Sequence, residues 1–303
     1  MKHLFAIACI ACPGVASADC LSESTLALQT IERSGYGIVS EGALSEDNGG
    51  CHLTRLVLEQ TSLLIDVEEI AWTLSGQEAF TTGNGTLALT LAVENARLIP
   101  NVSDPWVNYM LNQQNRRNLI DADLDLSWDL AAGTFNLNAL DVDLPGENHF
   151  SMSSLTKGMT ADLLSGNMAS LALITLHELS LEVTNTGFAD GLILGMAVGR
   201  FSGVPGAPET VVEATKEEVS SVVRALPKSF VDEASVTALL ALIADAPVPW
   251  GTLKMELKAP GGIGSDNLFG LAMSHDPTAP EAIEQAFQGT KVKVTFDALP
   301  DPE

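Results

Sequence analysis

Aspartates provide the first candidate chemistry in this sequence, and they gather within residues 120–144. Asp121, Asp123 and Asp125 alternate with apolar residues, so they share one face of an expected β-strand at roughly 6.5–7 Å spacing. Neighbours on a single strand are then too far apart to hold one small cation together, and calcium sites usually draw their ligands from loops. We interpret the aspartates as a solvated face that opposes edge-to-edge association, so no metal site is predicted.

The histidines beyond residue 18 are scattered along the chain: His52, His149, His177 and His275. His177-Glu178 begins like the zinc-protease pattern HExxH, but Leu181 stands where the second histidine should be. We therefore interpret His177 as a packed or hydrogen-bonded residue of a strand. His149 follows a Pro-Gly-Glu turn and is expected to be exposed.

The local motifs of nucleophilic and cofactor chemistry do not occur in the sequence. It contains no GxSxG elbow of serine hydrolases, no GxGxxG dinucleotide fingerprint and no phosphate-binding P-loop. No catalytic residue and no cofactor site is predicted, although catalytic residues can be assembled from distant positions without a local motif.

Residues 1–18 match the pattern of a secretory signal peptide. Lys2 gives a basic start, Leu4–Ala11 is a short apolar run, and Ala16-Ser17-Ala18 is a small-residue cleavage pattern. The run is too short to span a bilayer, which needs about 20 residues. We predict cleavage after Ala18, a periplasmic or secreted location in a bacterium, and no transmembrane segment after cleavage.

Cysteine usage agrees with export. Cys9 and Cys12 lie inside the predicted signal peptide, which leaves Cys20 and Cys51 as an even pair in an oxidising compartment. We predict a disulfide between them, worth roughly 3 kcal/mol in the chain-entropy model. Two unrelated free thiols are the alternative.

The charge balance excludes one class of partner. The 303 residues hold 15 Lys and Arg against 39 Asp and Glu, a formal net charge of −24. Such a surface repels the phosphates of nucleic acids, so no nucleic-acid binding is expected.

The alternation in Ile120–Leu144 predicts a long antiparallel hairpin with one face in a core and a break near Gly133. Apolar residues occupy the odd positions from Phe135 to Ala139, and from Leu140 they occupy the even positions. This change of parity indicates a β-bulge in the second arm, because a simple slip would turn the core face outward. A second change of parity, within residues 174–183, indicates another bulge.

Further strands and helices follow from the same periodicities. The predicted strands are 53–58, 63–74, 87–93, 174–183, 253–257 and 292–296, and the predicted helices are 23–34, 105–118, 209–226, 235–244 and 280–288. In the helix at 105–118, Asp104 is the expected N-cap, and Trp106 and Met110 are expected to face inward.

Together these elements predict an α+β fold. It contains a curved, bulged antiparallel β-sheet of about eight or more strands, with helices mainly in the C-terminal third packing on it. We divide the chain into a signal peptide (1–18), an antiparallel β-rich domain (19–200) and a helical cover with two further strands (201–303). The last two parts could also form one continuous domain. The residues predicted to be buried are Trp72, Leu89, Leu124, Leu126, Trp128, Leu179 and Leu181.

Glycines recur every four residues in an apolar segment, at Gly191, Gly195 and Gly199, with Leu192 and Met196 between them. Glycine inside a helix costs ~1 kcal/mol relative to alanine, so a close neighbour should compensate. We predict that these five residues contact an apolar ligand, because weakly stable segments commonly serve as lids. A helix laid tightly on the sheet, a glycine-rich loop and a self-association face are the alternatives.

The bulged strands with acidic outer faces, at 87–96, 120–144 and 174–183, resemble those of bacterial AsmA/TamB-like envelope proteins. The resemblance covers about a third of the chain and includes no diagnostic motif, so no functional residue is transferred. Those proteins are usually anchored in a membrane, whereas no anchor is expected here. The resemblance implies a curved sheet with an apolar groove that handles lipid.

The function that we predict is that of a non-catalytic, exported envelope protein. It binds or carries a lipid or other apolar ligand between its sheet and its helices, without a cofactor. The alternative is an acidic periplasmic interaction or structural protein that meets an envelope protein partner and depends on divalent cations. In that case the protein's own side chains fill the apolar face.

Overall fold

The computed structural model describes residues 20–300, except 48, 101, 103, 164–167, 188–206 and 276–278. The predicted signal peptide, the five residues of the glycine segment and the predicted boundary near residue 200 all lie outside the described residues. The chain divides into two compact units. Unit 1 comprises residues up to Pro145 together with Met159–Ser170, and unit 2 comprises Gly146–Gly158 together with Leu171–Glu303.

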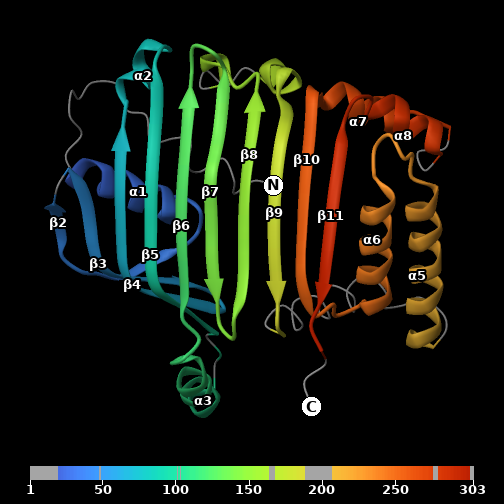
Figure 1. The fold of residues 1–303 in the computed structure, drawn as a ribbon. Helices are drawn as coiled ribbons and strands as arrows, with labels where there is room; N and C mark the ends of the chain where they lie inside the picture. Colours follow the sequence, from blue (N-terminus) through green and yellow to red (C-terminus); the bar gives the residue numbers. More distant parts are fainter. Residues whose placement is uncertain are drawn as a thin grey trace. The chain divides into compact units, whose positions relative to one another are not determined.

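Unit 1 is built on antiparallel strands in the order β1–β3–β4–β5–β6–β7, and β2 also pairs with β3 (Figure 1). The strands are β1 Gly37–Glu41, β2 Leu44–Asp47, β3 Gly50–Gln60, β4 Leu63–Ser75, β5 Thr86–Pro100, β6 Ile120–Asp129 and β7 Thr134–Leu144. The strands β6 and β7 form the hairpin predicted for 120–144.

Bulges curve these strands, as the sequence predicts. Asp125 pairs with Ala139 and Leu126 pairs with Leu137, so Asn138 is an extra residue in β7. A similar irregularity lies in β5, where the pairing with β6 passes from Val93 to Ala96. An extra residue bends a strand and increases its twist, so the sheet of unit 1 is curved.

The helices of unit 1 are α1 Cys20–Arg33, α2 Glu78–Thr82 and α3 Pro105–Asn115, with a 3-10 turn, η2, at Ala161–Leu163. Another 3-10 helix, η3, covers Met168–Leu173. Asp104 caps α3 as predicted, because its carboxylate accepts hydrogen bonds from the backbone N–H groups of Trp106 and Val107 at 2.8 and 3.1 Å. The inward position predicted for Trp106 and Met110 is wrong: their exposed fractions are 79% and 65%.

Unit 2 holds antiparallel strands in the order β8–β9–β10–β11. The strands are β8 Asn148–Lys157, β9 Thr175–Asn185, β10 Gly251–Gly264 and β11 Lys291–Ala298, and the helices are α5 Pro208–Ala225, α6 Glu233–Asp245, α7 Ser265–Ala272 and α8 Pro280–Ala286. His177 is the extra residue where the register of β9 with β8 shifts, as the change of parity predicts. In the part of the chain that the structure describes, eleven antiparallel strands and helices in the last third therefore confirm the predicted α+β class.

The free edge of β11 is covered by the segment that leads into α6. Phe230 O accepts a hydrogen bond from Val292 N at 2.8 Å, and Ser235 Oγ accepts one from Val294 N at 2.8 Å. Ser235 is fully buried, and its own N–H bonds Asp232, the N-cap of α6, at 2.7 Å. Hydrogen bonds from the Ser235 backbone and side chain lower the pKa of Asp232. These contacts satisfy ladder groups that would otherwise be open to another strand.

The prediction of seven buried residues is confirmed for Leu126 and Trp128 alone. The other five are half-buried: Trp72, Leu89, Leu124, Leu179 and Leu181. The alternation correctly places Trp72, Leu89 and Leu124 on the apolar face of unit 1, but that face borders a cavity. A period-two pattern identifies the face of a strand and cannot show how fully it is covered.

Substituting Ser235 tests how β11 is held. We expect Ser235→Ala to lower the free energy of unfolding by about 1–3 kcal/mol, because Val294 N–H loses its buried acceptor. Thr237→Ala is the matched control, since that hydroxyl is exposed and bonds Glu233 O within the same helix. Urea denaturation measures the free energy of unfolding of both variants. Equal losses of stability would contradict the role of Ser235 in holding β11.

Candidate functional site

Helix α1 carries an apolar stripe that faces the strands of unit 1. Ser24, Ala27, Leu28 and Ile31 lie at positions i, i+3, i+4 and i+7, which one helix face brings together. Leu28 and Ile31 pack against a buried cluster of Leu53, Leu56, Leu58, Val67 and Ala96. The three apolar residues of the stripe nevertheless stay half-buried, so the helix does not close onto the sheet along its length.

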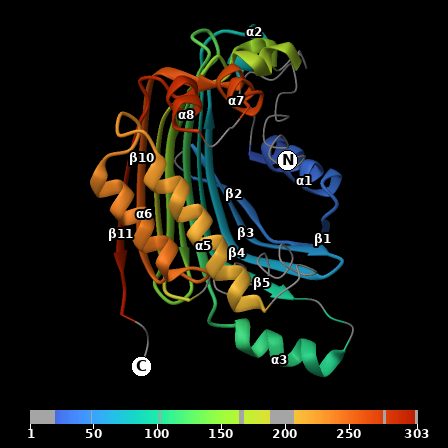
Figure 2. The ribbon, with the colours of Figure 1, turned by 90° about the vertical axis from the view of Figure 1, so that its right-hand side faces the viewer.

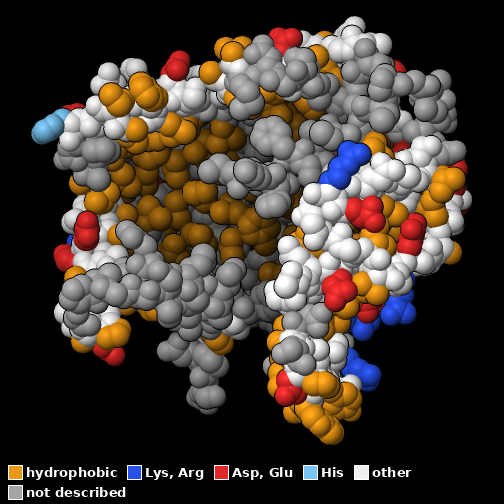
Figure 3. Space-filling model, turned by 180° about the vertical axis from the view of Figure 1, so that it is seen from behind, with side chains coloured by type: hydrophobic (Ala, Val, Ile, Leu, Met, Phe, Trp, Pro, Cys, Tyr) orange, Lys and Arg blue, Asp and Glu red, His pale blue; other side chains and the backbone are white. Residues whose placement is uncertain are grey.

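A cavity of about 670 Å³ separates α1 from the strands β3, β4, β5 and β6. All its described lining residues belong to unit 1. The sheet contributes mostly leucine, isoleucine and valine: Leu53, Leu56, Leu58, Ile65, Ile70, Leu74, Leu89, Leu91, Val93 and Leu124. Helix α1 lies on one side of these strands (Figure 2), and hydrophobic side chains are visible on that side of the strands (Figure 3).

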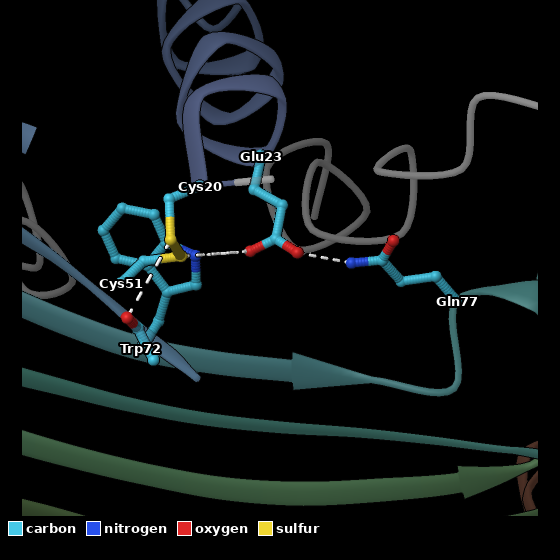
Figure 4. Close-up of a disulfide and its surroundings, with 6 residues drawn as sticks. Cys20, Glu23, Cys51, Trp72 and Gln77 are labelled. Atoms are coloured by element: carbon cyan, nitrogen blue, oxygen red, sulfur yellow. Dashed lines mark hydrogen bonds between the residues drawn. A yellow bond between two sulfur atoms is a disulfide. The ribbon is translucent and has the colours of Figure 1, made fainter. Parts of the chain in front are cut away.

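The start of α1 is fixed to the sheet by the disulfide Cys20–Cys51, which confirms the predicted pairing. The two Cα atoms lie 5.4 Å apart, and the bond closes a loop with a sequence separation of 31 residues. Cys20 is the first residue of α1 and Cys51 lies in β3, so the bond sets one end of the helix against the strand (Figure 4).

Glu23 makes a second link one turn further along α1. Its Oε2 accepts a hydrogen bond from Trp72 Nε1 at 2.7 Å, and its Oε1 accepts one from Gln77 Nε2 (Figure 4). Trp72 lies in β4 and Gln77 follows that strand, so one carboxylate ties α1 to β4 and to the turn after it. The exposed fraction of Glu23 is 8%.

Glu23 also places a charged group in the lining of the cavity. Among the described lining residues it is the one charged side chain. A carboxylate has about four acceptor positions, and two are used by Trp72 and Gln77. The hydroxyls of Thr30 and Ser34, which also line the cavity, donate to carbonyl oxygens of α1 itself. The arrangement can hold an apolar molecule and accept one hydrogen bond or one positive charge at Glu23.

Sequence reasoning did not identify Glu23 as a site residue. A single glutamate in the first turn of a helix usually faces solvent and complements the helix dipole. Its proximity to Cys20 was the available signal, because a disulfide at the start of α1 forces the first turn of the helix toward β3 and β4. The predicted ligand contacts at Gly191, Leu192, Gly195, Met196 and Gly199 lie in the part of the chain that is not described.

The opposite face of unit 1 carries the aspartates. They pair directly across β6 and β7, with Asp121 opposite Asp143 and Asp123 opposite Asp141. Asp123 and Asp125 line a more polar groove together with Asp47 and His52. Within residues 20–300 and outside the gaps, no group of three or more His, Cys, Asp or Glu residues is arranged to hold a metal ion.

The structure does not bring the histidines into one site. His52 Nδ1 lies 3.2 Å from Glu69 Oε1 in unit 1, and the other three belong to unit 2. His177 lies in the bulge of β9, and its Nε2 is 3.1 Å from Thr175 Oγ1, which confirms that it is hydrogen-bonded. His149 is a half-buried residue of β8 and pairs with Thr184, so its predicted place in an exposed turn is wrong.

Comparison of the sequence with models of known protein families and with curated proteins gives no match. The resemblance to AsmA/TamB-like envelope proteins therefore stays a prediction. Among the helices of the described residues, none is long and apolar enough to cross a membrane.

Reduction of the disulfide tests the link between α1 and β3. We expect reduction to lower the free energy of unfolding by roughly 3–4 kcal/mol, because the unfolded chain regains the entropy of a loop of about thirty residues. Urea denaturation with and without reductant measures this change. Intact mass after alkylation is the control for the bond itself, and labelling of both thiols without reductant would show that the bond is absent.

The aspartate pairs generate a separate prediction. Asp123→Asn should raise the free energy of unfolding by roughly 0.2–1 kcal/mol, because like charges directly opposite each other repel. The gain should shrink as salt screens the charges. Asp297→Asn in β11 is the matched control, since its opposite residue is Thr252. A loss of stability in the Asp123 variant would instead indicate that this carboxylate makes a favourable contact.

Proposed function

We propose that this chain is a non-catalytic, exported envelope protein that holds a lipid or other apolar ligand in the cavity beneath α1. The observation that carries the proposal is a cavity of about 670 Å³ whose described lining is mostly apolar and contains one charged side chain, the buried Glu23. Ligand pockets commonly measure about 300–1,000 Å³ and combine apolar walls with a few placed polar groups. The proposed site therefore lies under the N-terminal helix, and it does not depend on the glycine segment.

The position of Glu23 narrows the class of ligand. The carboxylate is buried beside the disulfide at the start of α1, and the rest of the described lining is mostly apolar and uncharged. A ligand with a hydrocarbon body and a hydroxyl or ammonium group at one end fits this site. Its hydrocarbon would contact the apolar walls, and its polar group would contact the Glu23 carboxylate. A ligand with an anionic end is disfavoured, because two negative charges would share a poorly hydrated space.

Export to the periplasm belongs to the same proposal. The signal-like pattern of residues 1–18 supports it, and so does the disulfide, because such bonds persist in oxidising compartments. The described lining of the cavity provides one carboxylate and no nucleophile paired with a base, so the proposal assigns no catalytic step to it.

The aspartate ladder favours a second candidate function. Asp121 lies opposite Asp143 and Asp123 lies opposite Asp141 across β6 and β7, so negative charge is concentrated on this face, which a cation or a basic partner would complement. The protein would then be an acidic interaction protein of the envelope, dependent on divalent cations. Calcium titration by calorimetry separates the two candidates, because a tight site supports this one and heat no greater than that of dilution counts against it.

Mass spectrometry of the protein purified without detergent tests the proposed function. We expect native spectra to carry an added mass close to one ligand per chain, and organic extraction should release that ligand for identification. A protein free of ligand, with no thermal shift from any class of lipid, would overturn the carrier role.

A pair of tryptophan substitutions locates the binding site. Leu89→Trp places a bulky side chain in the cavity, whereas Thr90→Trp places it on the opposite face of the same strand. We expect the first variant to lose at least tenfold in affinity for the apolar fluorophore N-phenylnaphthylamine, about 1.4 kcal/mol, and the second to bind like the wild type. Thermal unfolding shows whether both remain folded, and equal binding by the two variants would place the site elsewhere.

A further inference from the structure

Unit 1 exposes an apolar surface around α3 that is separate from the cavity. We call it the α3 patch, and it consists of Leu98, Val102, Trp106, Val107, Tyr109 and Met110, all of them exposed. The helix projects from the end of the sheet at which β5 finishes and β6 begins (Figure 1, Figure 2). Soluble surfaces seldom expose so many large apolar side chains together, which marks the patch as an interaction site.

The patch is held in shape by contacts of α3 itself. Trp106, Tyr109 and Met110 lie at i, i+3 and i+4, so they share one face of the helix. The rings of Trp106 and Tyr109 pack edge to face, with centroids 6.4 Å apart. Asn108 Oδ1 accepts a hydrogen bond from Val102 N at 2.8 Å, which ties the preceding segment to the helix.

The charges around α3 differ from those of the chain as a whole. Residues 105–120 contain no Asp or Glu, although the chain carries a net charge of −24. The exposed Arg116 and Arg117 follow the last turn of the helix directly. The exposed Asp104 caps the other end of α3, so the positive charge gathers at the C-terminal end beside the apolar face, and this end complements the phosphates and acyl chains of a lipid surface.

We propose that the α3 patch docks on the surface of a lipid bilayer. Trp106 and Tyr109 would lie at the level of the headgroups, where ring systems with one polar atom are favoured. Met110 and Val107 would enter the acyl boundary, and Arg116 and Arg117 would contact phosphates. This inference does not rest on the proposed ligand, because the patch and the cavity share no described residue.

A second exposed apolar group, on α7 in unit 2, provides a matched comparison. It consists of Leu268, Phe269 and Met273, whose exposed fractions are 56%, 68% and 70%. It contains neither Trp nor Tyr, and neither Lys nor Arg follows α7 within residues 273–278 of the sequence. The lipid partner is favoured for α3 and not for α7 because the interfacial aromatic residues and the nearby arginines occur together at α3 alone of these two helices.

Flotation of the full chain with lipid vesicles tests the proposal. The vesicles contain phosphatidylcholine and phosphatidylglycerol in equal amounts, with pure phosphatidylcholine as the neutral comparison. We expect the double variant Trp106→Ala/Met110→Ala to bind the vesicles at least tenfold more weakly, because two apolar side chains would no longer be buried in the lipid. Phe269→Ala/Met273→Ala should bind like the wild type. Because all four positions are exposed, thermal unfolding should confirm that both variants fold.

The arginines and the tryptophan give two further readouts. Arg116→Ala/Arg117→Ala should weaken binding to the charged vesicles by roughly fivefold or more for each arginine, and should change binding to pure phosphatidylcholine little. Brominated lipids should quench the tryptophan fluorescence of the wild type, and Trp106→Phe should abolish the quenching.

Three outcomes would overturn the docking of α3 on lipid. The first is a wild-type protein that floats with neither kind of vesicle. The second is loss of binding in the α7 variant and retention in the α3 variant. The third is a Trp106-dependent dimer in sedimentation without vesicle binding, which would assign the patch to a second copy of the chain. None of these outcomes bears on ligand occupancy of the cavity, which the native mass spectrum reports separately.

Discussion

The attachment of α1 at its first turn is the constraint on which the site in unit 1 depends. The Cys20–Cys51 bond and the hydrogen bonds of Glu23 with Trp72 and Gln77 fix one end of the helix against β3, β4 and the turn after β4. The apolar stripe further along the helix is only half-buried. A helix held in this way can stand over the sheet without packing fully onto it, and the space that remains is the cavity.

The curvature of the sheet supplies the other wall of that space. The bulges in β5 and β7 bend the strands, so that a face of leucine, isoleucine and valine turns toward α1. Apolar surface that is neither packed nor covered contributes little stability, and an apolar ligand would remove it from water. In unit 2 the contacts of Phe230 and Ser235 close the edge of β11, so that strand is protected without any ligand.

The strands and helices were well predicted from the sequence, because alternation and capping are local signals. The hairpin of 120–144, a bulge in its second arm, the N-cap Asp104 and the disulfide were all predictable from spacing and residue type, although the bulge lies at Asn138, two residues before the change of parity at Leu140. The cavity was not, because Leu89 and Leu124 show the same alternation whether their face is packed or open. The outward position of Trp106 also contradicts the usual preference of large apolar residues for the interior, and the nearby arginines were its available signal.

A crystal structure of the chain purified without detergent tests the central claim most directly. The account predicts that α1 stands away from the strands and that elongated electron density contacts Leu91, Leu124 and Glu23 in the space between them. The contrary result is an α1 that lies directly on β3–β6, with Leu28, Ile31 and Leu89 fully buried against one another and no space for a ligand. That packing would show a filled core in place of a binding site.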